Sequence, residues 1–227
     1  GSTCGNRYLR GDSLANLSEA DVRLLLERGV RTVIDLREPG EAAAQPSRLL
    51  DRPGVRVHPV PLFGDLNPIG STLPTQLGDL YLLCLRHGGP ALRRTFELLA
   101  GPAPGPASGG AGGAVLFHCA VGKDRTGIVA ALLLELAGVP RPVIVEDYLD
   151  SGLNLKQLVD KWIAQYESDP DTGYHPDLLH CLPQNIERLL DALVETYGGA
   201  GAYLRGAGVS DATLERIRRR LSDPGCR

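Results

Sequence analysis

The sequence has little that points to a membrane or to a nucleic acid as a partner. No apolar run approaches the roughly 18 residues of a membrane-spanning helix, which argues against stable membrane insertion. The formal net charge of −3 over 227 residues offers no strongly basic surface for nucleic acid. Residues 1–7 lack the basic and then apolar layout of a signal peptide, so we expect a cytoplasmic protein.

Cysteine is sparse, and its positions follow no regular spacing. The five cysteines are odd in number and contain no C-x-x-C pair, which argues against a disulfide framework and against a zinc knuckle. The five histidines are scattered as well, so we expect no bound metal and no cofactor. A reduced thiol among the cysteines is therefore a candidate nucleophile. The cysteines are Cys4, Cys84, Cys119, Cys181 and Cys226.

Apolar runs and turn residues predict an α/β fold. Strands are expected over 31–37, 54–60 and 114–117. Because strands alternate with helices early and helices dominate late, we expect one domain over 1–227. Its mostly parallel central sheet is flanked by helices, and its C-terminal part is helical. The expected helices cover 18–26, 77–87, 91–99, 126–137, 143–150, 155–166 and 183–197, with a last one capped by Ser210.

Two segments of this domain stand apart. The run GPAPGPASGGAGG at 101–113 has nothing to bury, so it is expected to be a flexible linker within the domain. Residues from about 150 to 182 are expected to form a helical lid or rim beside the functional site. An apolar stripe from Leu155 to Tyr166 there has two interpretations, core packing or a mobile lid that faces the substrate.

The run HCAVGKDRTG at 118–127 lies between an apolar strand and an apolar helix. A loop at a helix N-terminus directs backbone N–H groups inward and forms an anion-binding nest. Gly122 lets the backbone turn close to the ligand. Arg125, six residues after Cys119, can bind two phosphate oxygens through its guanidinium group. These positive surroundings favour a thiolate at Cys119, which is the nucleophile that phosphoryl transfer requires.

Other interpretations of this run are weaker. A buried cysteine at a strand end is often only a small apolar residue, and glycine and threonine can merely shape the turn. The ordered succession of strand, cysteine, glycine, Lys123-Asp124-Arg125 and helix favours a functional loop. A Walker A loop does not fit, because Gly122-Lys123 is followed by aspartate. A rhodanese-like sulfur-transfer site also places a cysteine at a strand end, but the charged run favours phosphate.

This loop, with cysteine, five residues and then arginine, resembles that of the protein tyrosine phosphatase superfamily. The fuller run is similar to its bacterial branch of tyrosine and phosphoinositide phosphatases. The likeness extends to Tyr8–Leu14 near the beginning and to Asp35-Leu36-Arg37 at a strand end. It continues with Asp147-Tyr148-Leu149 after the loop helix and with Gly208–Asp211 near the end.

The resemblance implies roles for the loop residues. Cys119 would be the nucleophile and Arg125 the phosphate clamp. The backbone N–H groups of residues 120–125 would make an oxyanion cradle. Thr126 would donate a hydrogen bond to the Cys119 sulfur. Lys123 would add a cation at the rim, as in relatives that accept phosphoinositides, or would be a solvated side chain. The substrate-binding residues are Ala120, Val121, Gly122, Lys123 and Thr126.

The proton donor and the supporting residues follow from the same likeness. Asp124 is the candidate general acid, with Asp65 as its rival. His118 would orient the loop, or would be a buried structural histidine. Asp35 and Arg37 end a strand where ligands of open α/β sheets gather. Asp35 would pair with Lys123 or Arg125 and hold the loop, or would have a helix-capping or surface role.

The resemblance implies a cysteine-dependent phosphatase whose partner is a phosphorylated substrate. Phosphotyrosine in a protein, a phosphoinositide and a small phosphorylated metabolite all fit the same cradle. An aromatic content of 5% makes a deep slot for phosphotyrosine less assured. The alternative is a phosphate-binding pseudophosphatase that recognises a partner, although intact Cys119, Asp124 and Arg125 argue against it. The sequence does not predict an oligomeric state.

Overall fold

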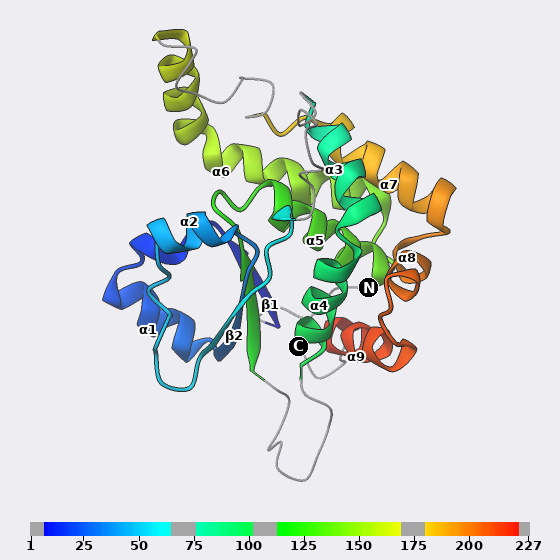
Figure 1. Cartoon of the computed structure of the whole chain (residues 1–227), viewed down its shortest axis with the longest axis horizontal. Helices are drawn as coiled ribbons and strands as arrows, with labels where there is room; N and C mark the ends of the chain where they lie inside the picture. Colours follow the sequence, from blue (N-terminus) through cyan, green and yellow to red (C-terminus); the bar gives the residue numbers. More distant parts are fainter. Residues whose placement is uncertain (1–6, 65–75, 102–112, 169–179, 223–227) are drawn as a thin grey trace.

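A computed structural model describes residues 7–64, 76–101, 113–168 and 180–222. Four parallel strands form its sheet in the order β1-β4-β2-β3, with helices on both sides (Figure 1). The predicted α/β class with a parallel sheet is confirmed. The strands are β1 (Tyr8–Gly11), β2 (Val30–Asp35), β3 (Arg56–Pro59) and β4 (Ala114–His118).

The two central strands, β4 and β2, carry the core of the sheet. All five residues of β4 are buried, as expected for a parallel strand that is covered on both faces. Successive side chains point to opposite faces. Val33 and Leu116 therefore join a smaller apolar cluster with α1, and Ile34 and Phe117 join a larger one with α3, α4 and α5. Figure 1 shows these helices on the two sides of the sheet.

Most helices lie where the sequence pattern places them. Helix α1 begins with the predicted capping box: Asp21 N–H donates to Ser18 Oγ at 3.2 Å, and Ser18 N–H donates to the Asp21 carboxylate at 2.9 Å. The described helices are α1 (Glu19–Glu27), α2 (Pro39–Ala44), α3 (Leu77–His87), α4 (Gly89–Ala100), α5 (Asp124–Leu136), α6 (Arg141–Ser168), α7 (Pro183–Tyr197), α8 (Ala200–Gly206) and α9 (Asp211–Ser222).

The prediction of two helices over 143–150 and 155–166 was wrong, because α6 is one continuous helix across that interval. Gly152 lowers helix propensity by roughly 1 kcal/mol relative to alanine, which is why the pattern suggests a break. In the structure Gly152 faces Cys181. A Cβ at this position would lie 3.0 Å from the Cys181 Cβ, so a small residue allows close packing that offsets the cost.

Beyond Asp150, α6 extends away from the rest of the fold (Figure 1). Leu158 of the predicted stripe is 36% exposed there, whereas Val159 is buried. The predicted stripe is thus only partly packed, and a mobile lid stays a prediction. Residues 169–179 of the expected lid and 102–112 of the expected linker lie outside the described residues. No helix in the described ranges combines the length and apolar character that crossing a membrane requires.

Candidate active site

The loop of residues 119–123 connects the end of β4 to the start of α5. Its two sides are tied to the neighbouring segments by backbone hydrogen bonds. Leu36 N–H donates to the His118 carbonyl at 2.9 Å, and Ser13 N–H donates to the Ala120 carbonyl at 3.1 Å. The loop therefore sits at the carboxyl end of the central strand, where open parallel sheets bind their ligands.

Cys119 lies at the base of this loop and is 2% exposed. The N–H group of Gly122 donates to its Sγ at 3.2 Å, which is the inward turn that an anion nest requires. Gly122 has a φ of +74°, and a Cβ there would lie 2.8 Å from the Gly11 carbonyl and 2.9 Å from the Asp12 nitrogen. Only glycine fits between the loop and the end of β1.

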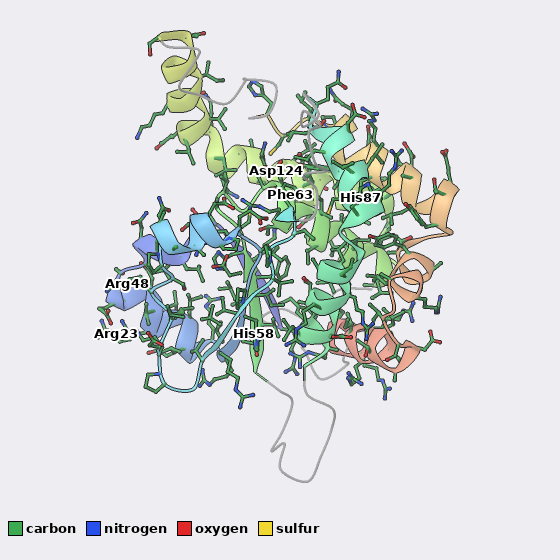
Figure 2. All side chains as sticks on the ribbon, in the orientation of Figure 1. Arg23, Arg48, His58, Phe63, His87 and Asp124 are labelled. Atoms are coloured by element: carbon green, nitrogen blue, oxygen red, sulfur yellow. The ribbon has the colours of Figure 1, made fainter. Side chains whose placement is uncertain are left out.

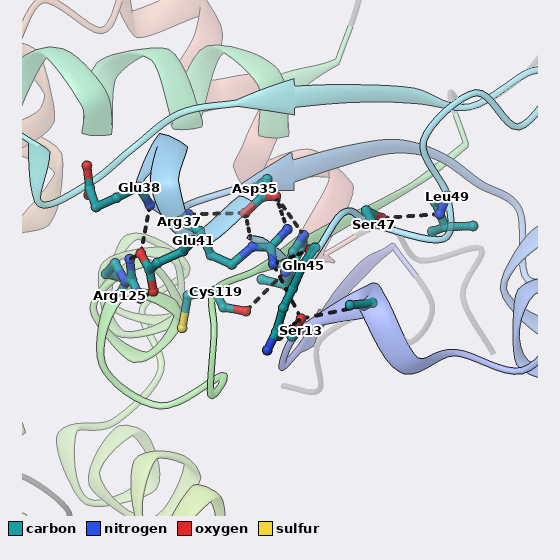
Figure 3. A network of polar contacts seen from close by, with 12 residues as sticks. Ser13, Asp35, Arg37, Glu38, Glu41, Gln45, Ser47, Leu49, Cys119 and Arg125 are labelled. Atoms are coloured by element: carbon teal, nitrogen blue, oxygen red, sulfur yellow. Dashed lines mark hydrogen bonds and ion pairs between the residues drawn. The ribbon is translucent and has the colours of Figure 1, made fainter. Parts of the chain in front are cut away.

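Arg125 lies in the first turn of α5 and is held by Glu41 of α2 (Figure 3). Its two terminal nitrogens donate to the Glu41 carboxylate at 2.5 Å and 2.8 Å, and its guanidinium carbon lies 5.5 Å from the centre of the Phe63 ring. Burial alone would lower the pKa of Arg125, but Glu41 and Cys119 raise it. The Nε–H and the remaining terminal N–H groups are donors that Glu41 does not use.

Glu41 itself is positioned by the backbone. The N–H group of Glu38 donates to the Glu41 carboxylate at 2.8 Å, and the hydrogen bonds from Arg125 lower the pKa of Glu41. The sequence analysis did not identify Glu41. The sequence does contain an indication of Glu41. Two glutamates follow the strand that ends in Asp35-Leu36-Arg37, at the same edge of the sheet as the Cys119 loop.

Replacing Glu41 by glutamine should lower kcat/KM about 10-fold. Glutamine keeps the size of the side chain but offers one acceptor oxygen and no charge, so Arg125 loses its bidentate partner and its fixed orientation. Steady-state kinetics on an aryl phosphate measure the effect. Glu97→Gln is the matched control, because its ion pair with Arg93 is exposed on α4 and should contribute little. Equal kcat/KM values for wild type and Glu41→Gln would show that Glu41 does not orient Arg125.

The expectation that Asp35 pairs with Lys123 or Arg125 was wrong. Asp35 instead accepts two hydrogen bonds from the Arg37 guanidinium, at 2.9 Å and 2.7 Å, in a buried ion pair (Figure 3). Burial opposes the charge on Asp35, but these bonds lower its pKa overall. Arg37 also donates to the Gln45 carbonyl at 2.8 Å. Because Gln45 ends α2, the pair holds in place the helix that carries Glu41.

His118 is completely buried beside this pair. Its Nδ1 lies 3.1 Å from the Cys119 carbonyl oxygen, and its Nε2 lies 3.7 Å from an Asp35 oxygen. Burial lowers the pKa of His118, which favours the neutral ring. His118 thus lies between the Cys119 backbone and the Asp35–Arg37 pair, and its role in orienting the loop stays a prediction.

Lys123 is not a solvated side chain at the rim, because it is only 3% exposed. Its Nζ lies 3.4 Å from Oδ1 of Asp124, which is half-buried at the start of α5. The same oxygen accepts a hydrogen bond from the Tyr81 hydroxyl at 2.7 Å. Figure 2 shows Asp124 and Phe63 in the region between α2 and α3. The structure thus brings the candidate acid to the loop that carries Cys119 and Arg125.

Three other candidates have different outcomes. The Thr126 hydroxyl is buried and makes no hydrogen bond with any residue that the structure describes, so the expected bond to the Cys119 sulfur is not present in this state. Asp65, the rival acid, lies outside the described residues. Val121 is a half-exposed loop residue, and its expected contribution through the backbone stays a prediction.

The sequence has relatives among known proteins. The model of the tyrosine phosphatase family matches residues 2–223. A tyrosine-protein phosphatase of Nostoc commune is 34% identical over 231 aligned positions, which cover 96% of this chain and 75% of the relative. The triple specificity protein phosphatase PtpB of Mycobacterium tuberculosis is 31% identical over 259 positions, which cover 93% of this chain and 89% of the relative.

The chain therefore belongs to the tyrosine phosphatase family. The predicted resemblance to the bacterial branch is confirmed, and the protein is a phosphatase, that is, a hydrolase of phosphate esters. The comparisons give no support to the alternative of a pseudophosphatase.

Proposed function

We propose that the protein hydrolyses phosphate monoesters through a phosphocysteine intermediate on Cys119. The observation that carries this proposal is the shared geometry of one loop. An inward N–H group from Gly122 binds the sulfur, and the guanidinium of Arg125, in the first turn of α5 directly after the loop, is fixed by Glu41. A nucleophile, an anion nest and a bidentate cation in one loop are the parts that phosphoryl transfer needs.

In the first step, the backbone N–H groups of 120–125 and Arg125 bind the phosphate oxygens. The Cys119 thiolate forms a bond to phosphorus while the bond to the ester oxygen breaks. The electron pair of that bond goes to the leaving oxygen, which takes a proton from Asp124. In the second step, water attacks phosphorus and the thiolate leaves. The Asp124 carboxylate takes the proton from this water, so both groups return to their starting state.

Phosphotyrosine in a protein is the substrate class that the relatives' names favour, since they are called tyrosine-protein and triple specificity protein phosphatases. Phosphoinositides and small phosphorylated metabolites are the alternatives. A panel of phosphotyrosine peptides, inositol lipids, sugar phosphates and nucleotides compared by kcat/KM tests this choice. We expect the highest value for phosphotyrosine peptides. A higher value for an alkyl ester would reassign the substrate, and no turnover of any ester would reject the phosphatase.

Replacing Asp124 by asparagine should slow the cleavage of alkyl phosphates about 100-fold, within the usual contribution of proton donation. An alkoxide is a poor leaving group and needs the proton, whereas a nitrophenolate leaves readily as the anion. The loss on nitrophenyl phosphate should therefore be much smaller. Because Asp124 also acts in the second step, the first step is compared in single-turnover experiments.

Equal losses on the two esters in these experiments would mean that Asp124 only shapes the loop. In that case Asp65, in the run FGDLN at 63–67, becomes the next acid to replace.

A further inference from the structure

A buried hydrogen-bonded pair of tyrosines leads to the carboxylate of Asp124. Tyr81 of α3 is completely buried and donates to Asp124 Oδ1 at 2.7 Å. The hydroxyl of Tyr148, on α6, lies 2.9 Å from the Tyr81 hydroxyl. The two rings meet edge to face, with centroids 6.2 Å apart and an interplanar angle of 86°. Three helices, α3, α5 and α6, thus meet at one acidic side chain.

The direction of these hydrogen bonds follows from the number of hydrogens. Each tyrosine hydroxyl has one hydrogen, and an ionised carboxylate can only accept. Tyr81 therefore gives its hydrogen to Asp124, and Tyr148 gives its own to Tyr81. Burial and the charge of Asp124 raise the pKa of both tyrosines, so both stay protonated and remain donors.

The two oxygens of Asp124 consequently differ. Oδ1 accepts from Tyr81 and also lies 3.4 Å from Lys123 Nζ. Oδ2 makes no hydrogen bond with any residue in the described part of the chain. A proton is accepted more readily at Oδ2 of Asp124, because Oδ1 already accepts a hydrogen bond from Tyr81 and lies beside the Lys123 ammonium.

We propose that Tyr81 is a positioning residue: its hydroxyl donates a hydrogen bond to Oδ1 of Asp124, so that Oδ2 is the oxygen that transfers the proton. Tyr148 orients Tyr81 by donating to its oxygen. The carboxylate is then fixed with one oxygen held by α3 and the other available to the leaving group and to water. This inference rests on the proposed role of Asp124 as the acid.

The packing of α6 against α5 supports the arrangement. A Cβ at Gly127 would lie 3.2 Å and 3.4 Å from two carbons of the Tyr148 ring, which is tighter than ordinary contact. Glycine at this position lets the ring lie directly on the first turn of α5. Gly127, the last glycine of the run HCAVGKDRTG, thus makes room for the Tyr148 ring, whereas Gly122 donates its N–H group to the Cys119 sulfur.

Tyr81 also packs in the core, so its ring and its hydroxyl must be separated by experiment. Tyr81→Phe keeps the ring and removes only the hydroxyl. We expect about a 10-fold loss in the first step with an alkyl phosphate, less than for Asp124→Asn, because the acid is still present but less well oriented. With nitrophenyl phosphate the loss should be less than about 3-fold, since that leaving group hardly needs the proton.

Single-turnover rates on the two esters are compared for wild type, Tyr81→Phe, Asp124→Asn and the double variant. In the double variant, Tyr81→Phe should add no further loss on the alkyl ester, because the group that it positions is gone. Tyr203→Phe is the matched control. It removes another buried hydroxyl of the same core, which donates to the Leu85 carbonyl at 2.9 Å, and it should leave the ratio of the two rates unchanged.

The outcomes separate this inference from the proposed function. If Asp124→Asn is selective for the alkyl ester but Tyr81→Phe slows both esters equally, or the two losses multiply in the double variant, Tyr81 is only a core residue. If Asp124→Asn itself slows both esters equally, the acid role fails and the positioning role fails with it. Should Tyr81→Phe not fold, Tyr148→Phe replaces it, with a smaller loss of the same selectivity expected and equal losses overturning the proposal.

Discussion

Replacement of Cys119 by serine is expected to abolish turnover of every phosphate monoester while leaving phosphate binding largely intact. A serine alcohol stays protonated at neutral pH and needs an adjacent base to become a nucleophile. The histidine next to it cannot serve, because its ring lies against the Cys119 carbonyl and Asp35. Binding survives, since the backbone N–H groups and Arg125 are unchanged.

Turnover assays on a phosphotyrosine peptide and calorimetry with inorganic phosphate measure the two effects separately. Cys84→Ala is the matched control: this cysteine is buried in α3, and burial raises the pKa of its thiol to about 12, so it carries no thiolate. The control should keep its kcat. Substantial activity in Cys119→Ser would reject the mechanism.

Replacement of Arg125 by lysine is expected to lower kcat/KM at least about 100-fold, because lysine keeps a charge but loses the bidentate guanidinium. The guanidinium binds Glu41 through its terminal nitrogens and still has N–H groups for phosphate. A lysine ammonium is a single point charge and cannot bind Glu41 and phosphate at the same time. The flat contact with Phe63 is lost as well.

Kinetics on nitrophenyl phosphate test this prediction, because its readily departing leaving group isolates phosphate binding and transfer from proton donation. Arg141→Lys is a suitable control. Arg141 pairs with Asp191 on the exposed surface of α6 and α7, where a change of cation should have little effect. If Arg125→Lys performed like wild type, Arg125 would not be the phosphate clamp.

The parts of the fold that the sequence predicts well are those whose pattern is local. A few neighbouring residues are enough to recognise the apolar runs at β2 and β4, the capping box of α1 and the apolar helix α5. Strand β1 was not predicted, because its sequence YLRG shows no alternation of apolar and polar residues, and pairing with β4 makes it a strand. The close packing at Gly152 of α6 involves Cys181, which is far along the chain and which the local pattern does not reveal.

The same distinction holds for the site. Cys119, Asp124 and Arg125 belong to one contiguous run whose chemistry can be read without the fold. Glu41 and Tyr81 cannot be read in this way, since they lie 84 and 43 residues from their partners. They are ordinary residues in the sequence, and tertiary packing alone makes them neighbours of the loop.

The wrong partner for Asp35 has a related cause. Lys123 and Arg125 were expected at the same sheet edge as Asp35, which suggested one of them as its partner. The partner is instead Arg37, only two positions along the chain. Arg125 is already bound by Glu41. Charges at a strand end are therefore predictable as a group, whereas their pairing depends on helices such as α2 that the pattern does not reveal.

Trapping the intermediate tests the central claim most directly. Asp124→Asn is mixed rapidly with radiolabelled nitrophenyl phosphate, because loss of the carboxylate slows the second step more than the first on this ester. The reaction is stopped by denaturation and the labelled peptide is mapped. We expect a burst of nitrophenolate with one phosphoryl group on the peptide that contains Cys119, and no label in the Cys119→Ser variant. A burst with the label on another residue would contradict the phosphocysteine mechanism.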